Sequence, residues 1–341
     1  MARLFISNLG FETEWQHGTV AQRIREFESQ MSCVWAPLWS EQDVLFAASP
    51  IDSEYWERLA ERGIPKPRLI SSLEADLSGI HKIVPWGWTK SIVELAKRIC
   101  PAQRVPNLDL VRVVNSRDYA VALESELGVS IGAEVCSTMR QVEACLKSFE
   151  SGGIVKPLLS QAGRGQVRLS SILEVPAKKC ERLLKSSPVV VEPWLSSLAE
   201  YGCQWDIAES GDVSMLGVTQ LASNPDGSFH RSQTGISKAN DHMKDILDFQ
   251  GQAVKRIANE GYFGPVGIDA MVYQDTHGQE RVRPLQDINT RFTMGRIAVE
   301  WSRKLGEQGM WIQARRDEVI PANAWLTSPV SAPQTWWVAI S

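Results

Sequence analysis

Two aspartates and an asparagine interrupt neighbouring apolar segments in the last third of the chain. Asp269 follows Ile268 in PVGIDAMVYQ, and Asp287 and Asn289 lie in ERVRPLQDIN. Carboxylates are uncommon inside strands, and a buried one is costly unless it is paired or binds a metal ion. The intervening turn DTHGQ predicts a β-hairpin, on which these oxygens could share one face. Such oxygen ligands are the kind that Mg²⁺ prefers.

The register of this expected hairpin decides whether the carboxylates meet. Pairing outward from the turn places Asp269 opposite Leu285, and alternation puts Leu285 and Asp287 on one face. Asp269 joins that face only if the register is even, because a slip of one residue would separate the two carboxylates. The alternative is that both aspartates are ordinary acids, solvated or paired with Arg281 or Arg283.

A lysine and a glycine-rich segment form a second candidate group. Lys156 ends the apolar run GIVK, where an ammonium group needs an anion such as phosphate. The following segment, SQAGRGQ, is expected to form a hairpin loop whose backbone N–H groups could fold over phosphates. Its candidate residues are Ser160, Gly163, Arg164 and Gly165. An ordinary turn is the alternative, and the chain contains no P-loop motif.

A third group follows the apolar segment PVVVEPWL. A strand that stops at a proline leaves backbone groups near Glu192 and Leu195 that could hydrogen-bond adenine, with Trp194 between them. Glu200 could accept hydrogen bonds from ribose hydroxyls. The alternative is a plain core strand with no ligand.

Alternating short strands and helices precede these groups. Strands are expected at 3–9, 43–49 and 67–73, and helices at 53–63, with Ser53 as N-cap, and 89–100. This alternation predicts an open α/β sheet. No G-x-G-x-x-G follows the first strand, so a dinucleotide site is not supported.

The rest of the chain divides into a mixed region and a mostly β region. Helices are expected at 116–128, 138–153 and 178–187, with strands at 153–159, 167–172 and 188–195. Further strands are expected at 201–223, 265–274 and 280–289, and helices at 241–261 and 292–309, with no clear pattern beyond about 320. Prolines and changes of pattern suggest three domains, 1–105, 106–192 and 193–341.

Composition excludes several classes of protein. The 341 residues carry a net charge of −4, which argues against a nucleic-acid-binding surface. Neither a signal peptide nor an apolar run long enough to span a membrane is recognisable. The six cysteines form no C-x-x-C pair, so reduced thiols and a cytoplasmic location are expected. The thirteen tryptophans indicate core packing, with an apolar substrate pocket as the alternative.

Taken in order, these groups resemble the ATP-grasp superfamily over about residues 110–300. The order is a strand ending in Lys156, a glycine loop, an apolar hinge, Glu200 and the acidic hairpin. The resemblance implies a mixed α/β and α+β architecture, in which a Rossmann-like α/β domain (the pre-ATP-grasp domain) precedes the ATP-grasp fold. It also implies ATP and Mg²⁺, or Mn²⁺, as cofactors.

The resemblance further implies a role for each candidate residue. The ATP phosphates would be bound by Lys156, Arg117 and the glycine loop, and adenine and ribose by Glu192, Trp194, Leu195 and Glu200. Mg²⁺ would be held by Asp269, Asp287 and Asn289. Arg291 would contact the acyl phosphate or the substrate.

The function implied by the resemblance is an ATP-dependent ligase. It would activate a small-molecule carboxylate as an acyl phosphate for attack by an amine, and a dimer is compatible with such an enzyme. Asp287 replaces the usual glutamate, the hinge reads Glu-Pro instead of Glu-Glu, and Thr290-Arg291-Phe292 replaces the Pro-Gly of D-alanine ligases. The alternatives are a phosphotransferase or carboxylase on the same fold and a non-catalytic nucleotide-binding protein.

Overall fold

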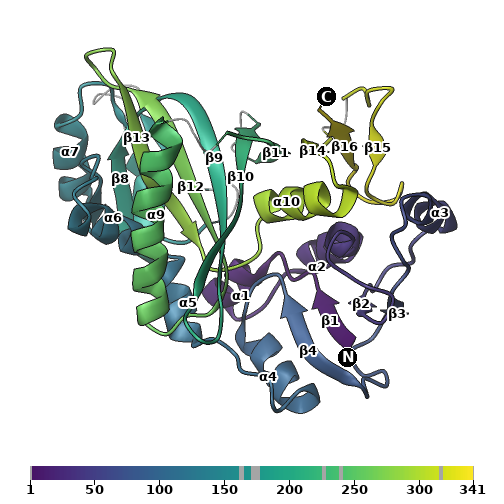
Figure 1. Cartoon of the computed structure of the whole chain (residues 1–341). Coiled ribbons are helices and arrows are strands. Elements are labelled where there is room, and N and C mark those ends of the chain that lie inside the picture. The colour runs from purple at the N-terminus through teal and green to yellow at the C-terminus, as the bar shows by residue number, and fades with distance from the viewer. Residues whose placement is uncertain are drawn as a thin grey trace.

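The computed structural model of the protein describes residues 2–160, 165–169, 177–224, 228–237, 241–314 and 318–340 (Figure 1). Within these ranges the strands form three sheets, one of eight strands and two of four. The mixed α/β and α+β architecture expected from the sequence is confirmed. No helix in the ranges given is both long enough and apolar enough to cross a membrane.

The first sheet is parallel and has the strand order β3-β2-β1-β4. Its strands are β1 (Ala2–Ile6), β2 (Val44–Phe46), β3 (Arg68–Ile70) and β4 (Ile80–Pro85), and its helices are α1 (Phe11–His17), α2 (Gln22–Gln30), the 3-10 helix η1 (Ser32–Trp35), α3 (Ser53–Glu61) and α4 (Lys90–Ile99). Helices α1 and α2 and strand β4 were not expected from the sequence. The N-cap of α3 is Asp52 and not Ser53, because the Asp52 carboxylate accepts the hydrogen bond from Tyr55 N.

The second sheet is small and antiparallel, with the order β5-β8-β6-β7. Its strands are β5 (Glu134–Cys136), β6 (Gly153–Pro157), β7 (Val167–Leu169) and β8 (Val189–Pro193), and the nearby helices are α5 (Leu108–Val114), α6 (Arg117–Glu126), α7 (Met139–Lys147) and α8 (Ala177–Ser186). Thr138 and Gln141 form a capping box at the start of α7, which fixes where that helix begins.

The large sheet has the order β13-β12-β9-β10-β11-β14-β16-β15. Its strands are β9 (Ser196–Ile207), β10 (Val213–Ser223), β11 (Phe229–Gln233), β12 (Gly264–Gln274), β13 (Glu280–Asn289), β14 (Gly309–Gln313), β15 (Trp325–Leu326) and β16 (Thr335–Ala339). The expectation of no pattern beyond residue 320 was wrong, since β15 and β16 complete this sheet. Helix α9 (Asp241–Asn259) packs on one face of the sheet, and α10 (Met294–Leu305) contacts β10, β11 and β14 (Figure 1).

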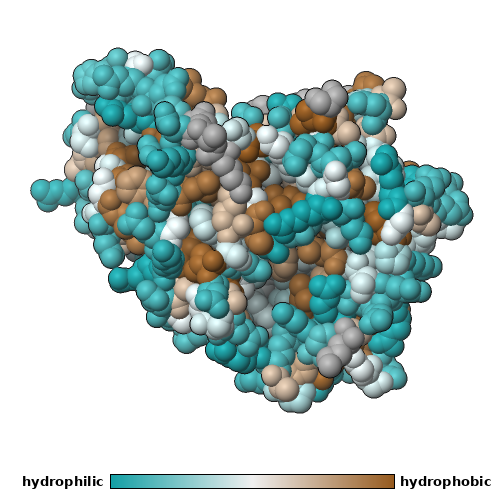
Figure 2. Space-filling model, viewed as in Figure 1, coloured by the Kyte–Doolittle hydropathy of each residue, from teal (hydrophilic) through white to brown (hydrophobic). Residues whose placement is uncertain are grey.

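Tryptophans join the first sheet to the end of the chain. Trp35 belongs to the same buried cluster as Trp301 of α10, Trp311 of β14 and Trp337 of β16. Core packing is therefore what these tryptophans do. All six cysteines are buried, and none forms a disulfide within the described part of the chain. The space-filling surface is notched along its upper edge, between the side of the molecule that carries α7 and the side that carries β14–β16 (Figure 2).

Candidate active site

The hairpin of β12 and β13 places Asp269 directly opposite Asp287. The prediction that Asp269 pairs with Leu285 was wrong. The register follows the expectation from the turn as far as the pair Met271–Arg283 and then shifts. Three residues of β13 lie between Arg283 and Asp287, opposite a single residue of β12. The first of the three is a proline, which cannot donate to the ladder and is typical of such irregularities.

The shift keeps the oxygen-bearing side chains on one face of the sheet. Gly267 is opposite Asn289, one alternation beyond the aspartate pair. On the other side of β12, β9 pairs Gly202 with Asp269 and Glu200 with Met271. Glu200, Asp269, Asp287 and Asn289 therefore share a face. For Asp269 this outcome required an even register, which is the one observed.

The carboxylates of Asp269 and Asp287 face each other and repel when both are ionised. Burial, together with the charge of Asp287, raises the pKa of Asp269 to about 7. Burial also raises the pKa of Glu200. Asn289 is buried beside the pair. A cation among these oxygens would remove the repulsion.

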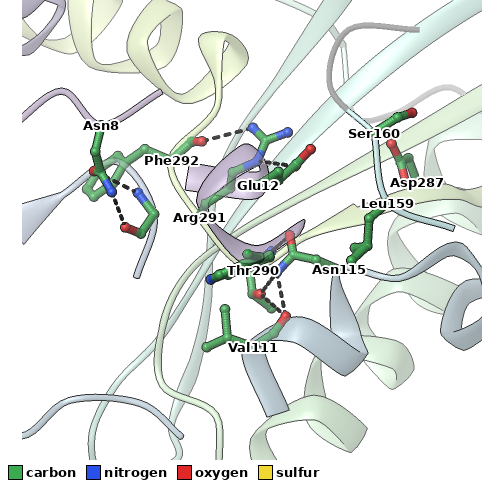
Figure 3. Close-up of polar contacts among 12 residues, drawn as sticks. Asn8, Glu12, Val111, Asn115, Leu159, Ser160, Asp287, Thr290, Arg291 and Phe292 are labelled. Atoms are coloured by element: carbon green, nitrogen blue, oxygen red, sulfur yellow. Dashed lines mark hydrogen bonds and ion pairs between the residues drawn. The ribbon is translucent and has the colours of Figure 1, made fainter. Parts of the chain in front are cut away.

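Arg117 connects this face to the end of β6. Its guanidinium donates to the carbonyl of Pro157 at 2.7 Å and to Oγ of Ser160 at 3.0 Å, and it lies 3.4 Å from Asp287 Oδ2. The backbone N–H of Arg117 also donates to Leu158 O at 3.0 Å. The first residue of α6 thus brings the segment after β6 next to the aspartate pair, and Ser160 and Asp287 lie close together in Figure 3.

Lys156 lies in a buried network of alternating charges. Its ammonium group pairs with Glu192, which Arg283 contacts at 3.0 Å on the other side. Arg283 also contacts Glu124 at 2.7 Å. All four side chains are buried, and sequence analysis missed this role of Arg283 and Glu124.

The pKa values of this network follow from burial and pairing. Burial lowers the pKa of Lys156, although Glu192 opposes the change. Burial would raise the pKa of Glu192, but Arg283 and Lys156 hold it below its usual value. Burial raises the pKa of Glu124, although Arg283 opposes the change. The ammonium group of Lys156 therefore has one carboxylate partner here and could also meet an anionic ligand.

The hinge after β8 carries the remaining nucleotide candidates. The backbone N–H of Trp194 donates to Gly152 O at 3.0 Å, and the guanidinium of Arg168 lies 3.4 Å from the centre of the Trp194 ring. Leu195 is partly exposed between β8 and β9. Gly165 has a left-handed backbone with φ of 79°. The candidates Gly163 and Arg164 lie outside the described residues.

Arg291 contacts a carboxylate that sequence analysis missed. Its Nε lies 3.6 Å from Oε1 of Glu12 in α1, and Nη1 donates to Phe292 O at 3.2 Å (Figure 3). Glu12 is 5% exposed, and burial raises its pKa, although Arg291 opposes the change. The preceding Thr290 is fixed by Asn115, whose Oδ1 accepts from Thr290 N at 3.1 Å. No local pattern in the sequence pointed to Glu12.

Comparisons with known proteins agree with this architecture. No family model matches the chain. The [butirosin acyl-carrier protein]–L-glutamate ligase of Niallia circulans is 23% identical over 318 residues, which cover 85% of this chain and 72% of that protein. N5-carboxyaminoimidazole synthetase from Staphylococcus aureus, solved with ADP, superposes with a TM-score of 0.61 at 9% identity, covering 100% of this chain and 93% of that one.

Two further solved structures share the fold. Phosphoribosylamine–glycine ligase from Thermotoga maritima gives a TM-score of 0.61 at 15% identity and covers 100% of this chain and 90% of its own. Biotin carboxylase from Campylobacter jejuni, solved as a β,γ-ATP complex, gives a TM-score of 0.56 at 13% identity. The superposition covers 84% of this chain and 84% of that one.

Proposed function

Because the chain has the ATP-grasp fold, we propose that it is an ATP-dependent carboxylate–amine ligase that forms an acyl phosphate and releases ADP and phosphate. The observation that supports this most strongly is the opposed pair Asp269–Asp287 beside Asn289, with Arg117 joining the pair to the segment after β6. The similarity to an acyl-carrier protein–glutamate ligase supports the same type of reaction.

The residues on the shared face fit a hard cation. All donors are oxygens, and burial together with the charge of Asp287 raises the pKa of Asp269, an effect that a bound cation would oppose. Asp269, Asp287 and Asn289 would hold Mg²⁺ or Mn²⁺. Bound there together with ATP, such a cation would supply charge neutralisation for transfer of the γ-phosphoryl group.

The cationic side chains complete the proposed site. Lys156 and Arg117 bind phosphate oxygens, while Glu192, Trp194 and Leu195 lie beside adenine and Glu200 meets ribose. Arg291 orients the carboxylate that attacks the γ-phosphorus. The electron pair of a carboxylate oxygen forms the new O–P bond, and the bond to the β-phosphate breaks onto ADP. The amine then attacks the carbonyl, phosphate leaves, and the amine loses a proton.

Domain boundaries and location complete the proposal. The three units 1–105, 106–192 and 193–341 would be the pre-ATP-grasp domain, the small lid subdomain and the metal-binding subdomain.

Buried cysteines that form no disulfide in the described ranges support a reducing, cytoplasmic location.

A direct test measures product formation from ATP, Mg²⁺ and panels of small carboxylates, first with hydroxylamine and then with candidate amines. A ligase is expected to give ADP together with a hydroxamate, because hydroxylamine traps the acyl phosphate, and an amide when the natural amine is present. A stable phosphorylated product would favour a phosphotransferase. Binding of ATP without turnover of any carboxylate would oppose the proposal.

Replacing Lys156 by methionine is expected to weaken ATP binding by about 10- to 100-fold, because one charged hydrogen bond to phosphate contributes about 1.5–3 kcal/mol. Glu192 keeps Arg283 at 3.0 Å in this variant, so its charge remains compensated. Calorimetric titration with a non-hydrolysable ATP analogue measures the change. Lys147→Met, on the exposed end of α7, is the matched control. Equal affinity in both variants would remove the phosphate role of Lys156.

A further inference from the structure

One amide side chain of α9 contacts all three strands that carry the acidic residues of the site. Gln250 is completely buried, although it lies in the apolar stripe by which α9 packs on the sheet. Its Oε1 accepts a hydrogen bond from Trp205 Nε1 of β9 at 3.0 Å, and its Nε2 donates to Pro284 O of β13 at 2.8 Å. Nε2 also lies 3.5 Å from Ile268 O of β12. The side chain therefore joins β9, β12 and β13 at one point.

The partners of Gln250 explain why an amide is buried there. An indole N–H can only donate and a peptide carbonyl can only accept, so the amide oxygen must face Trp205 and the nitrogen must face Pro284. An apolar residue of similar size would remove the partner of both buried groups, which costs more than the hydrogen bonds themselves contribute. The glutamine is thus required by its contacts on the sheet and not by the packing of the helix.

The contact with Pro284 lies at the irregularity of the hairpin. Pro284 is the first of the three residues of β13 that lie opposite Ala270 alone, so the ladder between the two strands is interrupted there. Among the described strands, β13 ends the large sheet and pairs with β12 alone. Gln250 therefore supplies this segment with a hydrogen-bond donor from outside the sheet, next to the residue that precedes Asp269.

The irregularity sets the distance between the two aspartates. If the pairing near the turn continued without a shift, Asp287 would lie opposite Gly267 and diagonal to Asp269. Diagonal neighbours are about 7–8 Å apart, whereas the Cβ atoms of directly opposed residues are about 4.5–5.5 Å apart. The shift therefore changes a diagonal pair of carboxylates into an opposed pair, which one cation can contact on both sides.

We propose that Gln250 is a positioning residue that holds this register shift and thereby sets the separation of Asp269 and Asp287; the inference rests on the metal site of the proposed function. Ile268 and Ala270 pack in the same buried cluster as the apolar residues of α9, so the helix covers the face opposite to the carboxylates (Figure 1). Gln250 acts through the backbone of β13 and does not contact the cation.

The test measures how strongly a metal ion increases the affinity for a nucleotide. A non-hydrolysable ATP analogue is titrated calorimetrically with and without Mn²⁺. In the wild type, Mn²⁺ is expected to increase the affinity by at least about 30-fold, because the aspartate pair and the phosphates hold the same ion. In Gln250→Met the increase should fall below about 3-fold, while the affinity without Mn²⁺ stays within about 2-fold of wild type. The Mg²⁺ concentration for half-maximal ADP release should rise by about 10-fold.

Two other variants of α9 separate positioning from a general loss of stability. Gln252→Met changes an exposed glutamine that donates to Asp248 O of its own helix, and it is expected to behave as wild type. Ile257→Val removes a methyl group from the buried stripe, so it should lower the unfolding temperature but leave the effect of Mn²⁺ unchanged. If Gln250→Met does not fold, Gln250→Asn, which keeps the amide but is one methylene shorter, replaces it with the same expectation.

The outcomes also distinguish this inference from the proposed function. If Gln250→Met keeps the wild-type effect of Mn²⁺, or weakens binding equally with and without Mn²⁺, the inference is wrong and the ligase proposal survives. A further loss when Gln250→Met is added to Asp287→Asn would also contradict it, because both changes should act on the same carboxylate pair. The titration requires no turnover, so the expected result in a protein that activates no carboxylate would overturn the ligase proposal alone. A wild type without any effect of Mn²⁺ would overturn the metal site and this inference together.

Discussion

The variant Asp287→Asn is expected to lose at least about 1,000-fold in ATP-dependent turnover, corresponding to about 4 kcal/mol of transition-state stabilisation. The asparagine keeps the size of the side chain but removes one of the two charges that face each other across β12 and β13. Phosphoryl transfer depends on charge neutralisation by the metal, so the rate suffers directly. The substitution relieves the repulsion of Asp269 but also removes the charged partner of Arg117, which keeps its hydrogen bonds to Pro157 O and Ser160 Oγ. The unfolding temperature of the metal-free variant should therefore stay close to that of wild type.

Two measurements check this expectation. ADP release is followed across a range of Mg²⁺ concentrations, and thermal unfolding is recorded with and without Mg·ATP. The stabilisation that Mg·ATP gives to the wild type should be absent or strongly reduced in the variant. Glu280→Gln is the matched control, because Glu280 starts the same strand, is exposed and pairs with His242 at the surface. Near-normal turnover by Asp287→Asn would remove the metal assignment.

The hairpin shows what local sequence can and cannot determine. The turn and the strand lengths follow from local patterns, and the pairing from the turn to Met271–Arg283 is the expected one. The irregularity after Arg283 begins at Pro284, and a proline marks where an irregularity can occur without fixing how many residues the pairing shifts. The shift changed the partner of Asp269 but kept Asp287 on the same face.

Contacts between distant segments were the main features that the sequence did not reveal. Glu12 and Arg291 are separated by most of the chain. Glu124 and Arg283 are 159 positions apart. Each carboxylate lies in an ordinary helical pattern. Glu124 gains its cationic partner because α6 packs against β13, and Glu12 gains its partner because the segment after β13 lies beside α1. Lys156 was detectable because a single lysine after an apolar run is unusual in itself.

The end of the chain was missed for a different reason. Strand β16 reads TWWVA, with buried residues at four consecutive positions, so the alternation that identifies a half-exposed strand is absent. Strand β15 has only two residues. Both are held by pairing with neighbours and by tryptophan packing against the first sheet, which are tertiary effects.

The second large effect concerns stability. Arg283→Met is expected to lower the free energy of unfolding by about 3–5 kcal/mol, because Glu124 loses its cation and Glu192 keeps only Lys156. Methionine fills much of the volume of arginine, so the loss comes mainly from uncompensated buried charge. Chemical denaturation monitored by tryptophan fluorescence measures it. Arg281→Met, two residues earlier on the same strand, removes an exposed pair with Asp275 and should cost about 0–1 kcal/mol.

The pH dependence of this loss identifies its cause. In the wild type, the pKa of Glu192 is lowered, so its stabilising contribution is present at neutral pH and is lost only on acidification. In Arg283→Met, the pKa of Glu124, which burial already raises, would rise further because no guanidinium opposes burial, and Glu192 would keep only Lys156 to lower its pKa. The ionised form of Glu124 is then more strongly disfavoured in the folded state, so the stability of the variant falls relative to wild type as the pH rises. The deficit relative to wild type should therefore be larger at pH 8 than at pH 5. A deficit that is equal at both pH values would instead indicate lost packing around the methionine, and the charge network would not be what stabilises this part of the fold.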